Sequence, residues 1–202
     1  MGVSPKDVIR RILAENPKKT ISDPSLTPAG VLLLLYPKDG EYCVLLNKRT
    51  DQVEHHKGEI SFPGGSKDTT DATLLDTALR ETYEEMGIRP EDVEVLGQLD
   101  DTPTSTNFLI TTTVGTIPYP YDFNPSELEV AEVLEIPLPA LMDDENRRDE
   151  VRIVDGDLDH VPSYVYQGHL IFGATARVIS RFLELLETVP SKERPWTSRR
   201  QG

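Results

Sequence analysis

The stretch that decides the fold is residues 71–88, which read DATLLDTALRETYEEMGI. An α-helix turns by about 100° per residue, so four of its side chains fall in one stripe that can face a core: Leu75, Leu79, Thr82 and Met86. Gly87 stands where such a helix can end, because glycine adopts the left-handed conformation of a C-terminal cap at little cost. The pattern therefore predicts an amphipathic helix over 71–87.

Another face of this helix carries three carboxylates, Glu81, Glu84 and Glu85, which lie within about 100° of arc. Glu81 and Glu85 are four residues apart, and like charges at this spacing cost free energy in a helix. Arg80 lies four residues before Glu84 and offsets only part of the repulsion. Water or a divalent cation can supply the rest, because hard cations such as Mg²⁺ bind carboxylate oxygens and keep waters and substrate phosphates as further ligands.

Glycines flank the helix on both sides. Without these glycines, a solvent-exposed acidic surface would be the more common explanation of three glutamates on one helix face. Gly64 and Gly65 come before the helix, where they allow a close approach between the backbone and a ligand, and Gly87 ends it. This context favours a ligand site over a plain acidic surface.

With these glycines, the segment resembles the Nudix box, which runs Gly, five residues, Glu, seven residues, Arg-Glu, an aliphatic residue, any residue, Glu-Glu, any residue, Gly and an aliphatic residue. The chain departs from the box at three points. Fourteen residues instead of thirteen separate Gly65 from Arg80, the early acidic residue is Asp71, displaced by one position, and Thr82 replaces the first aliphatic residue. The matching residues are Arg80, Glu81, Glu84, Glu85, Gly87 and Ile88.

The resemblance implies an α/β fold, a Nudix-type α/β/α sandwich with a mixed β-sheet, and a pyrophosphohydrolase that depends on Mg²⁺ or Mn²⁺. It implies that Glu81, Glu84 and Glu85 bind the metal and that Arg80 orients them. Either Glu84 or Glu85 is then a candidate for the general base. Nudix enzymes also recruit the base from outside the box, so three further acids stay open: Glu127, Glu129 and Glu132. Nudix enzymes often form dimers, which leaves a homodimer open.

Upstream of the box, LLNKRT at 45–50 and HKGEISFPGG at 56–65 resemble the motif that precedes the box in coenzyme A pyrophosphatases. Glu54 stands where that motif has a second arginine, and Asn47 where it has threonine. The resemblance implies cleavage of coenzyme A or acyl-coenzyme A to 3′,5′-ADP and 4′-phosphopantetheine. The residues that it assigns to this nucleotide-derived substrate are Arg49, Gly58, Phe62, Gly64 and Gly65, and we add His56 as a source of positive charge.

The charge balance supports a small phosphorylated substrate held by few cations. With 35 acidic and 21 basic side chains, the chain has a formal net charge of −14, which argues against nucleic acid as a partner. A bound cation can invert this field locally. Arg49, His56 and Lys57 are the basic candidates beside the glycines. A plain surface charge explains Arg49 equally well, and it is the better explanation of His55 and Lys57. His56 could equally be a loop histidine whose partners are backbone groups.

Two other functions remain open at this stage. A Nudix hydrolase of this kind can act on ADP-ribose, a dinucleoside polyphosphate or another nucleoside diphosphate derivative instead of coenzyme A. A Nudix-fold ligand sensor without turnover is the alternative from another class, but such sensors usually lose carboxylates of the box, and this chain keeps three together with Arg80. No Gly-x-x-x-x-Gly-Lys-Ser/Thr motif is present, so a P-loop hydrolase is not supported.

Periodicity predicts the remaining elements. We expect residues 50–70 and 143–150 to be loops. The predicted elements are a helix at 4–14, a hairpin of strands at 29–36 and 41–48, strands at 93–99, 108–117 and 132–136, a helical turn at 137–142, short strands near 151–154 and 163–166, and a closing helix at 174–186.

These elements suggest one main domain. We expect an N-terminal helix and linking loop over 1–28, the Nudix domain over 29–188, and a polar, mobile tail over 189–202. The single cysteine, Cys43, lies in an apolar run and reads as a small buried side chain. No apolar run reaches the roughly 18 residues of a membrane span, and the amino-terminal residues do not resemble a signal peptide, so the default compartment is the cytoplasm.

Overall fold

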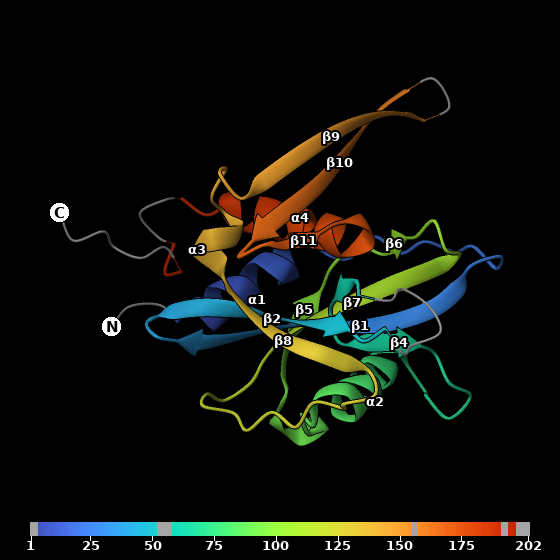
Figure 1. The fold of residues 1–202 in the computed structure, drawn as a ribbon, viewed down its shortest axis with the longest axis vertical. Coiled ribbons are helices and arrows are strands. Elements are labelled where there is room, and N and C mark those ends of the chain that lie inside the picture. Colours follow the sequence, from blue (N-terminus) through green and yellow to red (C-terminus); the bar gives the residue numbers. More distant parts are fainter. Residues whose placement is uncertain (1–3, 52–57, 155–156, 191–193, 197–202) are drawn as a thin grey trace.

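A mixed sheet of eight strands forms the centre of the protein (Figure 1). The computed structural model describes residues 4–51, 58–154, 157–190 and 194–196. The strands of this sheet are β1 (Thr27–Lys38), β2 (Glu41–Arg49), β3 (Ile60–Ser61), β4 (Gly64–Ser66), β5 (Glu94–Gln98), β6 (Thr102–Pro103), β7 (Phe108–Thr116) and β8 (Val130–Pro137).

Strand β1 organises the sheet, whose main path runs β3-β2-β1-β7-β5. It pairs in parallel with β7 and antiparallel with β2, and its first residues also pair antiparallel with β4. The predicted β1–β2 hairpin is confirmed, with its turn at Asp39 and Gly40, both of which have positive φ. Strands β6 and β8 add to β7 and β2.

Helices cover both faces of this sheet. Helix α2 (Leu74–Met86) lies on one face, where Leu32 and Leu34 of β1 point. Helices α1 (Pro5–Glu15) and α4 (Gly173–Glu187) share a core with Leu33 and Leu35 on the other face. A strand buried on both faces reads as a continuous apolar run, which explains the leucines of β1. This arrangement confirms the α/β/α sandwich with a mixed sheet.

A second, three-stranded antiparallel sheet contains β9 (Arg147–Val154), β10 (Asp157–Tyr166) and β11 (His169–Ile171). Strands β9 and β10 extend away from the body of the protein (Figure 1). The expected loop over 143–150 is therefore wrong from Arg147 onward. Two short helices complete the described elements, η1 (Pro90–Asp92) and α3 (Leu138–Leu141).

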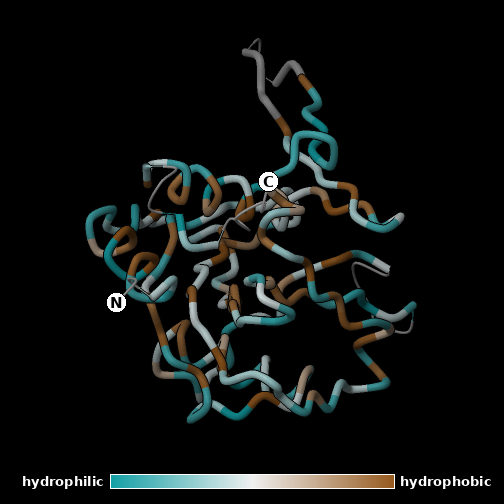
Figure 2. The backbone as a smooth tube through the Cα atoms, turned by 90° about the vertical axis from the view of Figure 1, so that its left-hand side faces the viewer, coloured by the Kyte–Doolittle hydropathy of each residue, from teal (hydrophilic) through white to brown (hydrophobic). Residues whose placement is uncertain are grey.

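The segments at both ends pack against the same core. Val8 and Ile12 of α1 are buried beside α4, and hydrophobic residues alternate with hydrophilic ones along the helices (Figure 2). Trp196 is only 2% exposed and belongs to this core, although it lies in the segment expected to be a mobile tail. The boundaries at 28 and 188 stay predictions. Among the described residues, none of the helices is long and apolar enough to cross a membrane.

Candidate active site

Both ends of α2 are fixed by specific contacts. Thr73 and Asp76 form a capping box, in which the Asp76 backbone N–H donates to Thr73 Oγ1 at 3.2 Å and the Thr73 N–H donates to Asp76 Oδ2 at 2.8 Å. At the other end Gly87 adopts the left-handed conformation with φ of 70°. Its N–H donates to the carbonyl of Tyr83 at 2.9 Å. The predicted helix end at Gly87 is therefore confirmed.

The loop before β8 covers the last carbonyls of α2. The backbone N–H of Asn124 donates to the carbonyl of Met86 at 3.0 Å, and that of Ser126 donates to the carbonyl of Glu85 at 2.9 Å. These bonds satisfy helix carbonyls that have no partner within the helix. They also hold the loop that contains Glu127 and Glu129 close to the box.

The buried face of α2 differs from the predicted stripe. Thr82 and Met86 are buried, but Leu75 and Leu79 are only half-buried. Helix and sheet approach so closely that a Cβ at Gly30 would lie 2.2 Å from the carbonyl oxygen of Leu74. A small side chain, that of Ala78, therefore faces the sheet at this point of close approach. The buried residues of α2 are Thr77, Ala78, Thr82, Glu85 and Met86.

Glu85 lies beneath the surface rather than on an exposed acidic face. Its Oε2 accepts hydrogen bonds from Asn47 Nδ2 at 3.0 Å and from the Gly64 N–H at 3.1 Å. Arg49 Nη1 lies 3.4 Å from Oε1. Burial raises the pKa of Glu85 to about 7, although the Gly64 N–H and the Arg49 charge act in the opposite direction.

Arg80 connects the other two glutamates to Asp71. Its Nε and Nη2 donate to the two oxygens of Asp71 at 3.1 and 3.0 Å. Its Nη1 donates to Glu81 Oε1 at 2.9 Å and to Glu84 Oε2 at 3.1 Å. Hydrogen bonds from Arg80 hold the pKa of Asp71 well below its usual range. The displaced acidic residue of the box thus fixes the arginine that orients Glu81 and Glu84.

Two glycines make room for this arrangement. A Cβ at Gly65 would lie 2.5 Å from the carboxyl carbon of Glu81. Gly64 has φ of 150°, and a Cβ there would lie 2.4 Å from the carbonyl oxygen of Gly30. Any larger residue at these positions would displace Glu81 or separate β4 from β1. Both glycines therefore allow the observed packing around the box. Contact between either glycine and a substrate stays a prediction.

The three box glutamates differ in their surroundings. Glu85 is buried, Glu81 is half-buried and burial raises its pKa, and Glu84 has a side chain that is 52% exposed. In the part of the chain that the structure describes, no group of three or more acidic, histidine or cysteine side chains is already gathered around one point to hold a metal ion. The carboxylates are instead turned toward Arg80, Asn47 and Gly64.

The donor set nevertheless fits a hard divalent cation. All three side chains offer carboxylate oxygens, the ligand type that Mg²⁺ and Mn²⁺ prefer. Glu81 and Glu84 meet at a single nitrogen of Arg80, so they already converge. Among the described residues, Glu85 Oε1 has only the long contact with Arg49, which leaves it the capacity to bind a cation. Glu81, Glu84 and Glu85 are therefore the residues that would hold the metal.

The residues expected to contact substrate differ in where the structure places them. Arg49 ends β2 beside Glu85, and Gly58 is half-buried with φ of 69°. Phe62 is only 4% exposed and packs in the core on the α4 side, so its side chain has a packing role and the expected substrate contact lacks support. His56, which was also expected to contact substrate, lies outside the described residues, as do Glu54 and Lys57.

Of the three candidate acids outside the box, Glu129 is the one whose charge acts on Glu81 and Glu85. Burial is the main cause of the raised pKa of both Glu81 and Glu85, and the negative charge of Glu129 raises both pKa values further. Glu132 lies 3.4 Å from Nε2 of His169, and strand alternation puts it on the face of β8 away from α2. Glu127 is exposed in the loop. The structure therefore favours Glu129 among these three.

Asn47 is the residue that sequence reasoning missed. It appeared only as a departure from the upstream motif, yet it is 1% exposed and bonded to Glu85. Its Oδ1 accepts a hydrogen bond from Ser61 Oγ at 2.8 Å. The available signal was a polar side chain directly after the apolar run of β2, at a position that can still be buried and where a buried amide needs partners.

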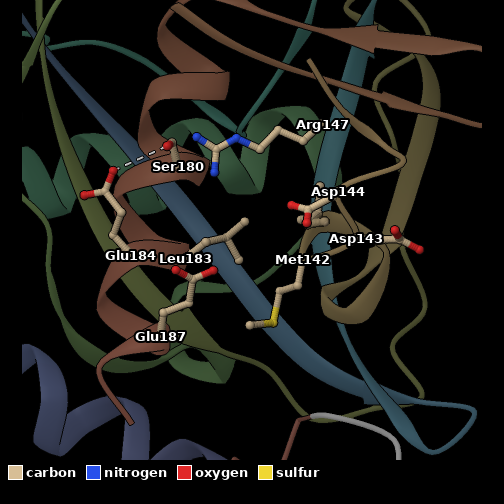
Figure 3. A pocket seen from close by; sticks show the side chains of 9 residues that line it. Met142, Asp143, Asp144, Arg147, Ser180, Leu183, Glu184 and Glu187 are labelled. Carbon is tan, nitrogen blue, oxygen red and sulfur yellow. Dashed lines mark hydrogen bonds between the residues drawn. The ribbon is translucent and has the colours of Figure 1, made fainter. Parts of the chain in front are cut away.

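The described residues line two hollows, one at the edge of this cluster of carboxylates and one away from it. One opens beside Glu84, between the end of α2 and the loop before β8, and is lined by Tyr83, Glu84, Gly87, Arg89, Asn124, Pro125 and Ser126. The other lies between α3 and α4 and contains no residue of the box. Figure 3 shows its polar lining, to which Asp143, Asp144, Arg147, Ser180, Glu184 and Glu187 contribute.

Comparison with known proteins identifies the family. The model of the NUDIX domain matches residues 26–152. The chain belongs to the Nudix hydrolase family. It is 36% identical to the Nudix hydrolase NudL of Enterobacter sp. (strain 638) over 174 residues, which cover 86% of this chain and 90% of the relative. The NudL protein of Yersinia enterocolitica is 34% identical over 184 residues, with 91% and 93% covered.

Solved Nudix structures share the fold. The Mycobacterium smegmatis (M. smegmatis) hydrolase RenU superposes with a TM-score of 0.54 and 22% identity, covering 81% of this chain and 88% of that one. A MutT/nudix family protein from Enterococcus faecalis gives a TM-score of 0.52 at 15% identity, with 93% and 76% covered. The protein is thus a Nudix pyrophosphohydrolase, and enzymes of this family generally use divalent metal ions.

Proposed function

We propose that this Nudix hydrolase uses Mg²⁺ or Mn²⁺ to cleave the pyrophosphate bond of coenzyme A or a short acyl-coenzyme A. The products are 3′,5′-ADP and the (acyl-)4′-phosphopantetheine. One observation carries the proposal: Arg49 of the upstream motif lies against Glu85 of the box, with 3.4 Å between Nη1 and Oε1. The motif that suggests the substrate and the box that suggests the chemistry therefore meet in one place.

The side chains have separate tasks in this mechanism. When bound, the metal polarises phosphoryl oxygens and lowers the pKa of a bound water. Arg80, fixed by Asp71, orients Glu81 and Glu84. Arg49 supplies positive charge to a phosphate beside Glu85, since guanidinium groups bind phosphate oxygens in pairs.

The proton of the attacking water needs an acceptor. Glu85 is already held by Asn47 and Gly64, which suits a metal ligand better than a mobile base. Glu84 is more exposed, and Glu129 lies beside the box without belonging to it. These two are the candidates that the surroundings favour.

A substrate panel tests the proposal. We expect coenzyme A and a short acyl-coenzyme A to be hydrolysed faster than ADP-ribose, NADH or dinucleoside polyphosphates, with 3′,5′-ADP identified by chromatography. Exhaustive treatment with EDTA should abolish turnover, and Mg²⁺ or Mn²⁺ should restore it. Undiminished turnover after EDTA treatment would disprove the metal-dependent mechanism.

ADP-ribose remains the second candidate because of Glu54. An acid in place of the motif arginine is unfavourable near a substrate with an additional 3′-phosphate. Under the coenzyme A proposal, Glu54→Arg should leave the KM for coenzyme A equal or lower. If coenzyme A is inert with both proteins while ADP-ribose turns over well, the substrate proposal is wrong and the family assignment stands.

A further inference from the structure

Behind Glu85 lies a chain of hydrogen bonds that begins on a different strand. Ser61 Oγ donates to Asn47 Oδ1 at 2.8 Å, and Asn47 Nδ2 donates to Glu85 Oε2 at 3.0 Å. Ser61 and Asn47 are direct partners in the pairing of β3 with β2. The order of donors and acceptors follows from the chemistry, since the carboxylate of an ionised Glu85 can only accept.

Ser61 fixes which way the Asn47 amide faces. A side-chain amide can rotate by half a turn, and the reversed orientation would point Oδ1 at the Glu85 carboxylate. The Ser61 hydroxyl donates to Oδ1 and so favours the orientation in which Nδ2 faces Glu85. Because Asn47 is 1% exposed, water cannot readily take over this role.

The two oxygens of Glu85 are consequently unequal. Oε2 holds two good hydrogen bonds, from Asn47 and Gly64, whereas Oε1 faces Arg49 at 3.4 Å. We propose that Ser61 and Asn47 are positioning residues that fix Oε2 of Glu85, so that Oε1 is presented to the divalent cation. This inference rests on the proposed metal-dependent function and extends it to residues outside the box.

Substitutions of nearly equal shape test the inference. Asn47→Leu keeps the branched shape and the number of heavy atoms of the side chain but removes both the donor and the acceptor, and Ser61→Ala removes the donor that orients Asn47. Partners behind metal ligands typically contribute about 10–100-fold to metal affinity or activity. We expect Mn²⁺ affinity, measured by electron paramagnetic resonance without substrate, to fall about 10-fold or more in Asn47→Leu and less in Ser61→Ala.

The double variant separates the hydrogen-bond chain from simple packing. If Ser61 acts through Asn47, Asn47→Leu with Ser61→Ala should bind Mn²⁺ no more weakly than Asn47→Leu alone. The metal concentration for half-maximal activity should rise, while the KM for substrate at saturating metal stays unchanged. Gln98→Leu is the matched control, because Gln98 donates to Thr113 Oγ1 at 3.3 Å between β5 and β7 and has no hydrogen bond with any described residue of the box.

Wild-type Mn²⁺ affinity in a folded Asn47→Leu protein, or additive losses in the double variant, would overturn the inference. Thermal unfolding without metal provides a second measurement, in which the losses of Tm for the two single variants should again be non-additive. If the wild-type protein binds no Mn²⁺, both the proposed function and the positioning role fail. If the wild type binds Mn²⁺ and the variants match it, only the positioning role fails.

Discussion

The three glutamates of the box have different surroundings, although the sequence presents them as equivalent. Glu85 is buried and held by Asn47 and Gly64, whereas Glu81 is half-buried against Gly65. Glu84 is more than half exposed and contacts Arg80. Removing the charge of each residue should therefore have a different effect on stability and on turnover.

Glu84→Gln should reduce kcat by at least about two orders of magnitude while leaving Tm nearly unchanged. The substitution removes a ligand charge or a base without altering the shape of the side chain. Because the Glu84 side chain is more than half exposed, the substitution should change the stability of the fold little. Steady-state kinetics and thermal unfolding measure the two effects. Glu184→Gln is a matched control, because Glu184 is 59% exposed and lies 3.5 Å from Arg181 on α4. A near-normal kcat would place the essential carboxylate elsewhere.

Asp71→Ala should impair activity although Asp71 lies outside the metal ligands. Without Asp71, Arg80 loses two of its hydrogen bonds and no longer orients Glu81 and Glu84 firmly. We expect at least about a 10-fold higher Mg²⁺ requirement, the lower limit for a partner behind a metal ligand. Asp23→Ala, in an exposed turn with Ser25, should leave this requirement unchanged. An unaltered Mg²⁺ dependence in Asp71→Ala would contradict the role given to Asp71.

Among the elements, the segment between α1 and β1 is held by side chains that the sequence did not connect. Lys18 Nζ lies 2.8 Å from Asp101 Oδ1, and the Ile21 N–H donates to Asp101 Oδ2 at 3.1 Å. Thr111 Oγ1 donates to Oδ1 at 2.7 Å. Asp101 therefore ties residues 18–21, predicted as a plain linking loop, to β7.

This tie should make stability depend on pH. Burial alone would raise the pKa of Asp101, but hydrogen bonds from Lys18, Thr111 and Ile21 outweigh it and leave the pKa lowered. The ionised carboxylate thus stabilises the fold above the ordinary aspartate pKa, and this contribution is lost as the pH falls through the lowered value.

Asp101→Asn should accordingly cost about 1–3 kcal/mol at pH 7, the range for a buried bond to a charged group. As the pH falls from 7 through the lowered pKa of Asp101, the wild-type carboxylate itself protonates and the difference should shrink. Denaturant unfolding across this pH range provides the measurement. Equal pH dependence in the two proteins would show that Asp101 is not the titrating group.

Long elements with a clear period were predictable from sequence, and very short ones were not. Helices α1, α2 and α4 and strands β1, β2, β5, β7 and β8 were predicted close to their observed bounds. Strands of two or three residues, such as β3, β4, β6 and β11, are too short to show alternation. Strand β9 begins with charged residues at Arg147, which suit a sheet edge but read as a loop.

The site was predictable as a set of residues but not as an arrangement. Spacing alone identified Arg80 and the three glutamates. The burial of Glu85 depends on Asn47, 38 residues away, and on β4 lying against α2. A glutamate that follows another glutamate on an acidic helix face reads as exposed, so only the packing of α2 on the sheet could reveal the true surroundings of Glu85.

At the level of the whole molecule, the C-terminal segment contributes to the main core. Trp196 is 2% exposed and packs with α1 and α4, and Arg194 Nε donates to the carbonyl of Val189 at 2.7 Å. The segment after α4 thus closes part of the core that α1 also covers. Its polar composition hid this role in the sequence.

Trp196→Ala should destabilise the protein by about 3–5 kcal/mol, as expected for a large aromatic side chain removed from a core. Trp196→Phe, which retains much of the apolar surface, should cost considerably less. Because Trp196 is the single tryptophan, the native protein should also show blue-shifted fluorescence that moves to the red on unfolding. A solvent-like emission spectrum in the native state would contradict the packing of Trp196.

The way in which Glu85 is held also bears on the order of assembly during synthesis. In the described part of the chain, the hydrogen bonds to its carboxylate come from residues 38, 36 and 21 positions away, all on the amino-terminal side. The β1–β7 ladder, by contrast, pairs Thr27 with Phe108 and must wait for a much longer loop to close. These three partners of the Glu85 carboxylate are therefore synthesised before β7. Glu129 follows later, so the nascent chain can bring the partners of the Glu85 carboxylate together before the rest of the sheet closes around them.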